Sequence, residues 1–349
     1  MSYFASFLGG DGFGTYQVDW SSSPPSFERI SRPPDVLLIP GFVDIHIHGA
    51  FGIDFMSASP SELGVLAEKL EAVGYESFLP TTVTCSAGDA ERAISRLPDH
   101  PAIAGFHLEG PFISKEHPGA QPPHFIVDPP QGPSEWDGVL DDPRLKVITL
   151  APERPGALEL ISRLNSRGVA VGLGHTDATF EEARRGFEFG ASHTTHTFNA
   201  MRGFHHREAG AAGYALASDG LATELIYDRL HVSPDAARLL IKCKPEHKVV
   251  AVSDSTMATG MPPNLTVEMW GHKCITGKGE VRLADGGALA GSAITLYDAF
   301  QNLAENFGTE TAIRACCLNP RRIIGASAPP RLYIEMNFSY EIVGRRTRG

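Results

Sequence analysis

Eight apolar segments rich in β-branched residues recur along the chain, and helix-like segments separate most of them. The segment 59–74 is typical of the separators, because Ser59 or Ser61 can cap its first turn and Gly74 can end it. Buried strands that alternate with helices predict a parallel sheet, and eight of them favour its closure into a TIM-type (β/α)8 barrel. The candidate strands cover residues 37–48, 75–84, 102–110, 145–153, 169–177, 192–200, 224–232 and 247–254.

An open, doubly wound sheet is the alternative architecture for the same alternation. Its usual glycine-rich turn after the first strand, G-x-G-x-x-G, is missing from this sequence, which disfavours it. A Pro-rich stretch, HPGAQPPHFIVDPPQGP (117–133), follows the third candidate strand. Its length predicts an ordered loop of the kind that covers active sites.

The two ends of the chain fit the barrel pattern poorly. The first 36 residues are rich in Ser, Pro and Gly, and residues 266–291 have the pattern of short strands and turns. We therefore predict a small β-domain built from both chain ends. In this division residues 1–36 and 321–349 form the β-domain, 37–265 form the barrel, 266–294 connect the two, and 295–320 supply the last barrel helices.

The composition excludes several classes of partner. The chain has 349 residues and a formal net charge of −11, which disfavours nucleic acid and anionic membranes. No apolar run approaches the ~20 residues that cross a bilayer, and the N-terminus lacks the pattern of a secretory signal. The cysteines are odd in number and form no C-x-x-C pair, so we expect no disulfide framework and a cytoplasmic setting. They are Cys85, Cys243, Cys274, Cys316 and Cys317.

Two histidines interrupt the apolar stretch GFVDIHIHGA (41–50). His46 and His48 lie two residues apart, so in a strand both imidazoles project from one face, with Asp44 behind them. Taken alone, the pair is best explained as hydrogen-bonded core histidines, because so short a pattern arises by chance. The other strand ends change that interpretation.

Six of the eight candidate strands end in a residue type that binds metals or transfers protons. In a barrel of this kind the carboxyl ends of the strands face the active site. Packing alone explains such an arrangement poorly, because ionisable groups are costly to bury unpaired. Imidazoles with carboxylates suit Zn²⁺ or a similar transition ion. The residues are His46, His48, His107, Glu109, His175, Asp177, His196, Asn199, His231 and Asp254.

Six motifs in order carry a family resemblance: PGFVDIHIHG, HLEGPF, GHTDAT, HTFNAM, VSDSTMATG and LAGSA. Between about residues 40 and 319 the sequence resembles the amidohydrolase superfamily. HLEGPF and HTFNAM are typical of the branch that deacetylates N-acetylglucosamine 6-phosphate. The resemblance implies a (β/α)8 barrel with a small β-sandwich made from both chain ends, in agreement with the pattern above.

The resemblance also implies a ligand set and a mechanism. Glu109, His175 and His196 match the ligands of the principal metal. His46 and His48 match a pair that binds a second metal in some members, so one or two ions per chain are expected, Zn²⁺ first and Fe²⁺ as the alternative. Asp254 matches the residue that acts as general base and then acid while a metal-activated water attacks the acetamide.

Further residues match the positions that contact the phosphorylated amino sugar. They are Gln121, Asn199, Ala200, Arg207, His231, Leu289, Ala290 and Gly291. Arg207 lies in MRGFHHREAG (201–210), whose arginines and histidines favour anion binding even though such loops are often only solvated surface. Relatives imply a homodimer whose partner subunit reaches toward the phosphate.

Some positions differ from the family pattern, and at others two roles are consistent with the sequence. Gln121 stands where many relatives have histidine, and Arg229 replaces a small residue. His107 and Asp177 either orient ligands or only form core hydrogen bonds.

Two other functions are possible. Amidohydrolases of cyclic amides or N-acyl amino acids often carry a carboxylated lysine at the end of strand four, where this chain has TLAPE and only Lys146 at the start. A non-catalytic barrel would lack a ligand or the aspartate, yet every expected one is present.

Overall fold

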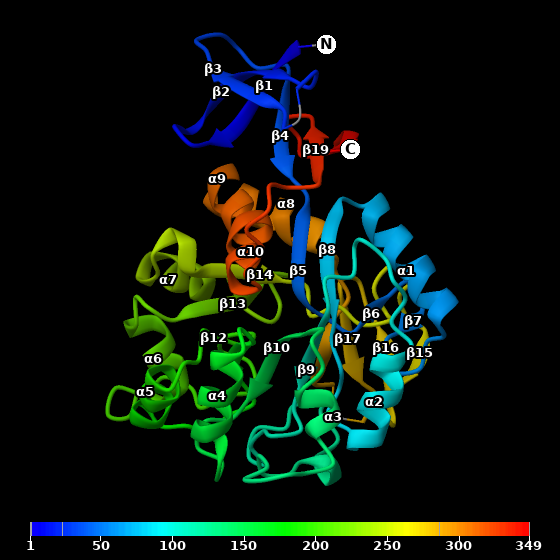
Figure 1. Ribbon diagram of the computed structural model, residues 1–349, viewed down its shortest axis with the longest axis vertical. Helices are drawn as coiled ribbons and strands as arrows, with labels where there is room; N and C mark the ends of the chain where they lie inside the picture. Colours follow the sequence, from blue (N-terminus) through cyan, green and yellow to red (C-terminus); the bar gives the residue numbers. More distant parts are fainter. Residues whose placement is uncertain (1, 23, 286, 349) are drawn as a thin grey trace.

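A computed structural model describes residues 2–22, 24–285 and 287–348 of the chain (Figure 1). Its largest parallel element is a six-stranded sheet in which strands consecutive along the chain are neighbours. Every pair in this sheet is parallel. The strands are β9 (Phe106–Glu109), β10 (Leu145–Leu150), β11 (Ala170–Leu173), β12 (His193–Thr194), β13 (Ala222–Ile226) and β14 (Val249–Val252).

Two further parallel strands, β5 (Phe42–Ile47) and β8 (Tyr75–Pro80), pair with each other. A parallel bridge between Thr81 and His107 links the end of β8 to β9. A second bridge, between Ile47 and Ser255, links the end of β5 to the segment after β14. The parallel strands therefore form a curled sheet, and the predicted α/β class is confirmed.

Helices connect these strands, as the alternating pattern predicts. The first, α1 (Pro60–Ala72), is capped by Ser59, whose side chain accepts a hydrogen bond from the backbone of Glu62 while the Glu62 side chain accepts one from Ser59 N. The other helices are α2 (Ala87–Ser95), α3 (Asp137–Leu140), α4 (Ala157–Ser166), α5 (Phe180–Glu188), α6 (Gly210–Ala217), α7 (Pro234–Cys243), α8 (Leu296–Phe307), α9 (Thr309–Ile313) and α10 (Asn319–Ile323). Short 3₁₀ turns η1 (Pro123–Phe125) and η2 (Glu246–Lys248) and a π-helical turn η3 (Arg314–Leu318) complete the set.

The core has several layers, because the strands carry apolar side chains on both faces. One face packs against the buried stripes of the helices, such as Leu63, Leu66 and Leu70 of α1. The other face of the strands supplies a separate apolar cluster. Its members include Val43, Ile45, Leu79, Val147, Ile226, Val250 and Val252.

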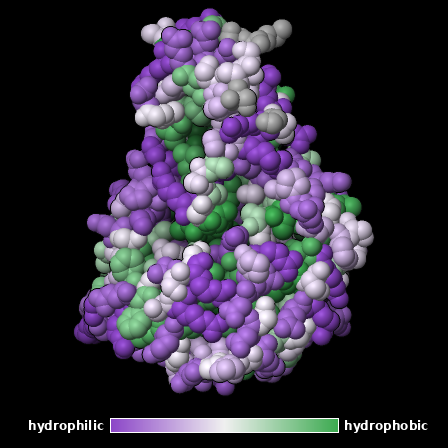
Figure 2. Space-filling model, viewed as in Figure 1, coloured by the Kyte–Doolittle hydropathy of each residue, from purple (hydrophilic) through white to green (hydrophobic). Residues whose placement is uncertain are grey.

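A second six-stranded sheet combines both ends of the chain, in the order β20-β19-β4-β1-β2-β3. Figure 1 shows it at one end of the longest axis, and it contains the first and last strands of the chain. In Figure 2 the visible face is mainly hydrophilic, and apolar residues gather where this sheet meets the rest of the molecule. Its strands are β1 (Ser2–Gly9), β2 (Gly12–Asp19), β3 (Ser26–Arg29), β4 (Val36–Pro40), β19 (Leu332–Met336) and β20 (Ile342–Thr347).

The first predicted strand, 37–48, is in fact two strands in different sheets. β4 belongs to the sheet of the chain ends and β5 to the curled parallel sheet. The chain passes between them at Gly41, where a Cβ atom would lie 2.7 Å from the Cβ of Glu76. Only glycine fits so close an approach, which explains the break in an otherwise continuous apolar run.

A four-stranded antiparallel sheet forms from residues predicted as a connection. It comprises β15 (Thr266–Met269), β16 (His272–Thr276), β17 (Glu280–Leu283) and β18 (Leu289–Ser292), and a bridge between Ser255 and Ser292 ties it to the end of β14. A short hairpin, β6 (Gly49–Ala50) and β7 (Ile53–Asp54), follows β5. None of the helices in the described ranges combines the length and apolar character needed to span a bilayer.

Candidate active site

Six ligand-type side chains meet at the carboxyl ends of the parallel strands. His46 is in β5, His48 follows it, and Glu109 is the last residue of β9. The other three lie two residues beyond the ends of β11, β12 and β14. All six are buried, and they are His46, His48, Glu109, His175, His196 and Asp254.

Three of these residues leave the strand conformation that the sequence pattern predicts. The φ angles of His175, His196 and Asp254 are +46°, +28° and +47°. A left-handed backbone is strained for a residue with a side chain and is typical of functional sites. Each strand therefore ends earlier than expected, and the turn directs the side chain toward its neighbours.

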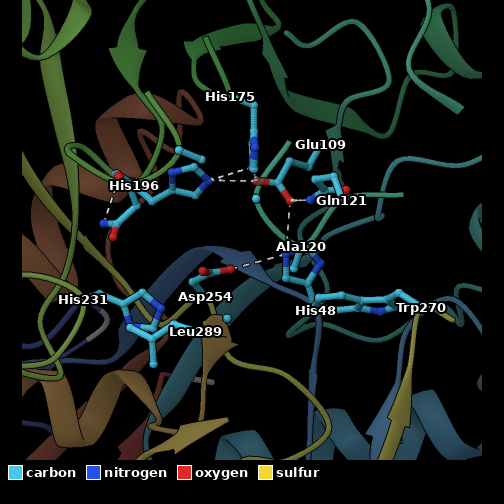
Figure 3. Close-up of a pocket in the computed structure, with 14 residues that line it drawn as sticks. His48, Glu109, Ala120, Gln121, His175, His196, His231, Asp254, Trp270 and Leu289 are labelled. Atoms are coloured by element: carbon cyan, nitrogen blue, oxygen red, sulfur yellow. Dashed lines mark hydrogen bonds and ion pairs between the residues drawn. The ribbon is translucent and has the colours of Figure 1, made fainter. Parts of the chain in front are cut away.

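Glu109, His175 and His196 form the first group that could hold a metal ion (Figure 3). The Nε2 atoms of His175 and His196 lie 3.2 Å and 3.1 Å from Glu109 Oε1, and 3.1 Å from each other. Two imidazole nitrogens and a carboxylate oxygen that converge at one point are a donor set that suits a transition ion.

His46, His48 and Asp254 form the second such group. Asp254 Oδ1 lies 3.5 Å from His46 Nε2 and 3.3 Å from His48 Nε2. Glu109 reaches this group as well, because its Oε2 is 3.2 Å from His48 Nε2 (Figure 3). The carboxylate of Glu109 thus joins the two groups.

The buried Nε2 of His46 has no hydrogen-bond partner among the described residues. Its other ring nitrogen, Nδ1, faces Glu224 at 3.2 Å. The outer nitrogens of His48 and His175 face backbone carbonyls, those of Thr81 at 3.1 Å and His117 at 2.9 Å. With the outer nitrogen protonated, a neutral imidazole presents a lone pair on Nε2. The residues therefore fit a cation.

Mutual attraction keeps both carboxylates ionised. Burial alone would raise the pKa of Glu109, but the neighbouring imidazoles of His46, His175 and His196 hold that pKa well below its usual range. Burial likewise opposes ionisation of Asp254, and a hydrogen bond from His48 lowers its pKa. The same pair of carboxylates raises the pKa of His48 to about 9 in spite of burial. The site thus favours positive charge.

One pocket opens onto both groups (Figure 3). It contains most of the predicted substrate residues, since Gln121, Asn199, Ala200, His231, Leu289 and Gly291 all line it. Ala290 instead packs into an apolar cluster with Ala258 and Met269. Arg207 is exposed on its loop and does not line the pocket.

Two of the pocket residues are fixed by hydrogen bonds. Gln121 Nε2 donates to Glu109 Oε2 at 2.6 Å, and Gln121 Oε1 accepts from the backbone of Thr84 at 2.7 Å. His231 Nδ1 lies 2.6 Å from Asp228 Oδ2, and this contact raises the pKa of His231 against the opposing effect of burial. Residues 119–121 of the loop 117–133 contribute to the lining of the pocket.

The remaining candidates lie around the site. His107 stays in the interior, with Nε2 2.8 Å from Thr149 Oγ1, and burial pushes its pKa well below the usual value. Asp177 forms a two-pronged contact with Arg202, whose Nη2 is 2.6 Å from Asp177 Oδ2. Arg229 forms an ion pair with Glu305 at 2.6 Å and does not line the pocket.

Trp270 is a pocket residue that the sequence did not reveal. It occupies the turn between β15 and β16 with φ +55°, and its Nε1 donates to Asp54 Oδ2 at 3.0 Å. Its ring packs edge-on against His48 with centroids 5.1 Å apart. Glu224 was also missed, although a lone carboxylate in an apolar strand is a signal that could have identified it.

Parallel strands whose carboxyl ends hold two linked groups of histidine and carboxylate define a metal-dependent enzyme of the α/β class. The sequence model of the amidohydrolase family matches residues 37–328. The chain belongs to this family, and the resemblance inferred from its motifs is confirmed.

Similar proteins agree with this assignment. The chain is 37% identical to N-acetylglucosamine-6-phosphate deacetylase of Bacillus subtilis, over 80% of this chain and 73% of that protein. It is 35% identical to N-acetylgalactosamine-6-phosphate deacetylase of Escherichia coli O157:H7, over 83% of this chain and 78% of that protein.

Solved structures show the same fold. The N-acetylglucosamine-6-phosphate deacetylase of Thermotoga maritima aligns with a TM-score of 0.90 at 29% identity, covering 99% of this chain and 97% of that one. An aspartate-to-alanine variant of the Mycobacterium smegmatis enzyme, in complex with N-acetyl-D-glucosamine 6-phosphate, aligns with a TM-score of 0.89 at 27% identity, covering 100% of this chain and 98% of that one.

Proposed function

We propose that this chain is a metal-dependent deacetylase that hydrolyses N-acetylglucosamine 6-phosphate to glucosamine 6-phosphate and acetate. The observation that carries the proposal is that Glu109 joins two buried groups of metal-ligand type at the floor of one pocket. The choice of substrate is supported by the similar proteins, which are named as N-acetylglucosamine-6-phosphate deacetylases.

The metal would be held by Glu109, His175 and His196, with His46 and His48 holding a second ion. Neutral imidazoles with few carboxylates suit Zn²⁺ best, and Fe²⁺ is the alternative. When bound, such an ion polarises the amide carbonyl and makes water more acidic.

Asp254 is the proton carrier of the proposed reaction. It is buried, yet it lines the pocket, and its low pKa leaves it ionised and able to accept a proton from the attacking water. The same carboxyl then gives that proton to the amine nitrogen as the carbon–nitrogen bond breaks. One residue thus serves as base and acid in turn.

The other lining residues bind the sugar. Gln121 and His231 offer polar groups at opposite sides of the pocket (Figure 3). Asn199 Nδ2 donates a hydrogen bond to the backbone oxygen of His196 at 3.2 Å. Arg207 would bind the phosphate within a homodimer, since in a single chain it is exposed outside the pocket. Phe204, in the same loop, is 64% exposed and would be covered there.

The proposal extends to architecture and compartment. The bridges at Ile47 and Thr81 support closure of the eight parallel segments into a complete (β/α)8 barrel. The sheet of the chain ends supports a small domain made of residues 1–36 and 321–349. All five cysteines are free, which suits a cytoplasmic enzyme.

Acetate release tests the function. Metal-loaded protein should release acetate from N-acetylglucosamine 6-phosphate and far more slowly from unphosphorylated N-acetylglucosamine. The 35% identity to a galactosamine enzyme makes N-acetylgalactosamine 6-phosphate a second candidate substrate, to be assayed in parallel. Failure to cleave either phosphorylated sugar, with cleavage of another N-acyl or cyclic amide, would overturn the proposal.

A further inference from the structure

Glu224 is a buried carboxylate to which the proposed reaction gives no role. It lies in the middle of β13, between apolar and hydroxyl side chains, and none of its surface is exposed. Because a buried charge is costly unless it is paired, the groups around this carboxylate indicate its purpose.

The carboxylate of Glu224 contacts one histidine of each candidate ligand group. Its Oε2 lies 3.2 Å from Nδ1 of His46 and accepts a hydrogen bond from the backbone nitrogen of His196 at 3.0 Å. The backbone of the same residue accepts from Thr197 N at 2.9 Å. One side chain thus braces one ligand histidine and the turn that carries another.

The contact with His46 selects a tautomer. An ionised carboxylate can only accept hydrogen bonds, so the proton of a neutral His46 must be on Nδ1. The lone pair is then on Nε2, which lies 3.3 Å from Glu109 Oε1 and 3.5 Å from Asp254 Oδ1. This nitrogen has no hydrogen-bond partner among the described residues.

Glu224 distinguishes His46 from His48 and His175. The outer nitrogens of His48 and His175 face neutral backbone carbonyls, whereas that of His46 faces a carboxylate. An imidazole that is hydrogen-bonded to a carboxylate is a stronger metal ligand than one that is hydrogen-bonded to a carbonyl. The carboxylate also adds a negative charge close to the ion.

His193 lies beside the other oxygen of Glu224 without forming a hydrogen bond to it. Its Nε2 is 3.3 Å from Glu224 Oε1, and its Nδ1 is 2.8 Å from Ser192 Oγ. Gly172 leaves the space for this ring, because a Cβ there would lie 2.8 Å from His193 Nε2. The carboxylate therefore lies between two imidazoles, and its hydrogen-bond contacts on one side hold Oε2 toward His46.

We propose that Glu224 is a positioning residue of the second metal group, which fixes His46 in the Nδ1–H form and strengthens binding of the ion held by His46 and His48. The inference rests on the proposed function, since it requires that this group binds a metal. It predicts a selective effect: the ion at Glu109, His175 and His196 depends much less on Glu224.

Zinc binding by Glu224→Gln tests the proposal. The variant keeps the shape of the side chain and removes its charge. Equilibrium dialysis of metal-stripped protein should give two ions per wild-type chain. In the variant one ion should bind as before and the affinity for the other should fall 10- to 100-fold. Glu76→Gln is the matched control, because Glu76 is also buried but pairs with Arg321 at 2.7 Å and lies outside the pocket.

The possible outcomes separate the two proposals. Equal affinity for both ions in Glu224→Gln and wild type, or equal weakening of both, overturns the role of Glu224. A wild type that binds one ion also overturns it and leaves the deacetylase proposal intact. A wild type that binds neither Zn²⁺ nor Fe²⁺ overturns both.

A second measurement needs no variant. In zinc-loaded wild-type protein with ¹⁵N-labelled histidine, the nitrogen resonances of His46 should show a protonated Nδ1 and a metal-bound Nε2. A metal-bound Nδ1 would overturn the proposal even if Glu224→Gln fails to fold.

Discussion

Gln121 and Glu109 are joined by a hydrogen bond of 2.6 Å, in which Gln121 Nε2 donates to Glu109 Oε2. The same oxygen lies 3.2 Å from His48 Nε2. A residue of the loop 117–133 therefore touches the carboxylate that joins both candidate ligand groups. This contact links the conformation of the loop 117–133 to the shape of the candidate metal site.

Replacing Gln121 should reveal that link. Gln121→Ala removes a donor to Glu109, and we expect metal affinity and kcat/KM to fall about 10- to 100-fold, as for other residues that orient ligands. Gln121→Glu places a like charge beside Glu109 and should be worse. Metal titration and steady-state kinetics of both variants check whether Gln121→Glu lowers metal affinity and kcat/KM more than Gln121→Ala does. Wild-type metal affinity in Gln121→Glu would contradict it.

Asp254→Asn should fold and bind substrate, yet lose most of its turnover. The amide cannot accept the proton of the attacking water, and loss of a general base lowers rates by about 10²- to 10⁴-fold. Single-turnover assays at saturating substrate measure the effect. A variant with more than a tenth of the wild-type kcat would show that another group transfers the proton.

Arg207→Ala should raise KM for the phosphorylated sugar and leave the unphosphorylated one almost unchanged. An arginine binds phosphate through charge-assisted hydrogen bonds that plain N-acetylglucosamine cannot form. The unphosphorylated sugar is therefore an internal control for damage to the fold. If both KM values rise equally, Arg207 does not bind the phosphate.

Arg229 offers a test of backbone strain away from the pocket. Its φ is +69°, a left-handed conformation that glycine adopts at little cost and that other residues adopt at a cost of about 1 kcal/mol. Arg229→Gly and Arg229→Ala both lose the ion pair with Glu305, so their difference isolates the backbone. Urea denaturation should show the glycine variant more stable by about 1 kcal/mol. An alanine variant of equal or greater stability would contradict the strain argument.

The sequence predicted the ligand residues because their positions follow from strand geometry. His46 and His48 share a face by the two-residue period of a strand, and Glu109 ends a short apolar run. The motifs around these residues then led to the family. The early ends of the strands before His175, His196 and Asp254 were not predictable in this way, because a left-handed residue leaves no mark in an apolar pattern.

Residues that depend on contacts between distant elements were missed. Trp270 reaches the pocket from a hairpin more than a hundred residues from the loop of Gln121, and no spacing in the sequence links the two. The break at Gly41 was hidden for the same reason, since it is required by the side chain of Glu76 on another strand. Long-range packing decided both features.

Anomalous diffraction at the zinc edge, from crystals of zinc-loaded protein, tests the central claim most directly. We predict one peak in contact with Glu109, His175 and His196, and a second beside His46 and His48. An active, zinc-loaded crystal with no anomalous peak within coordination distance of Glu109 would contradict the account.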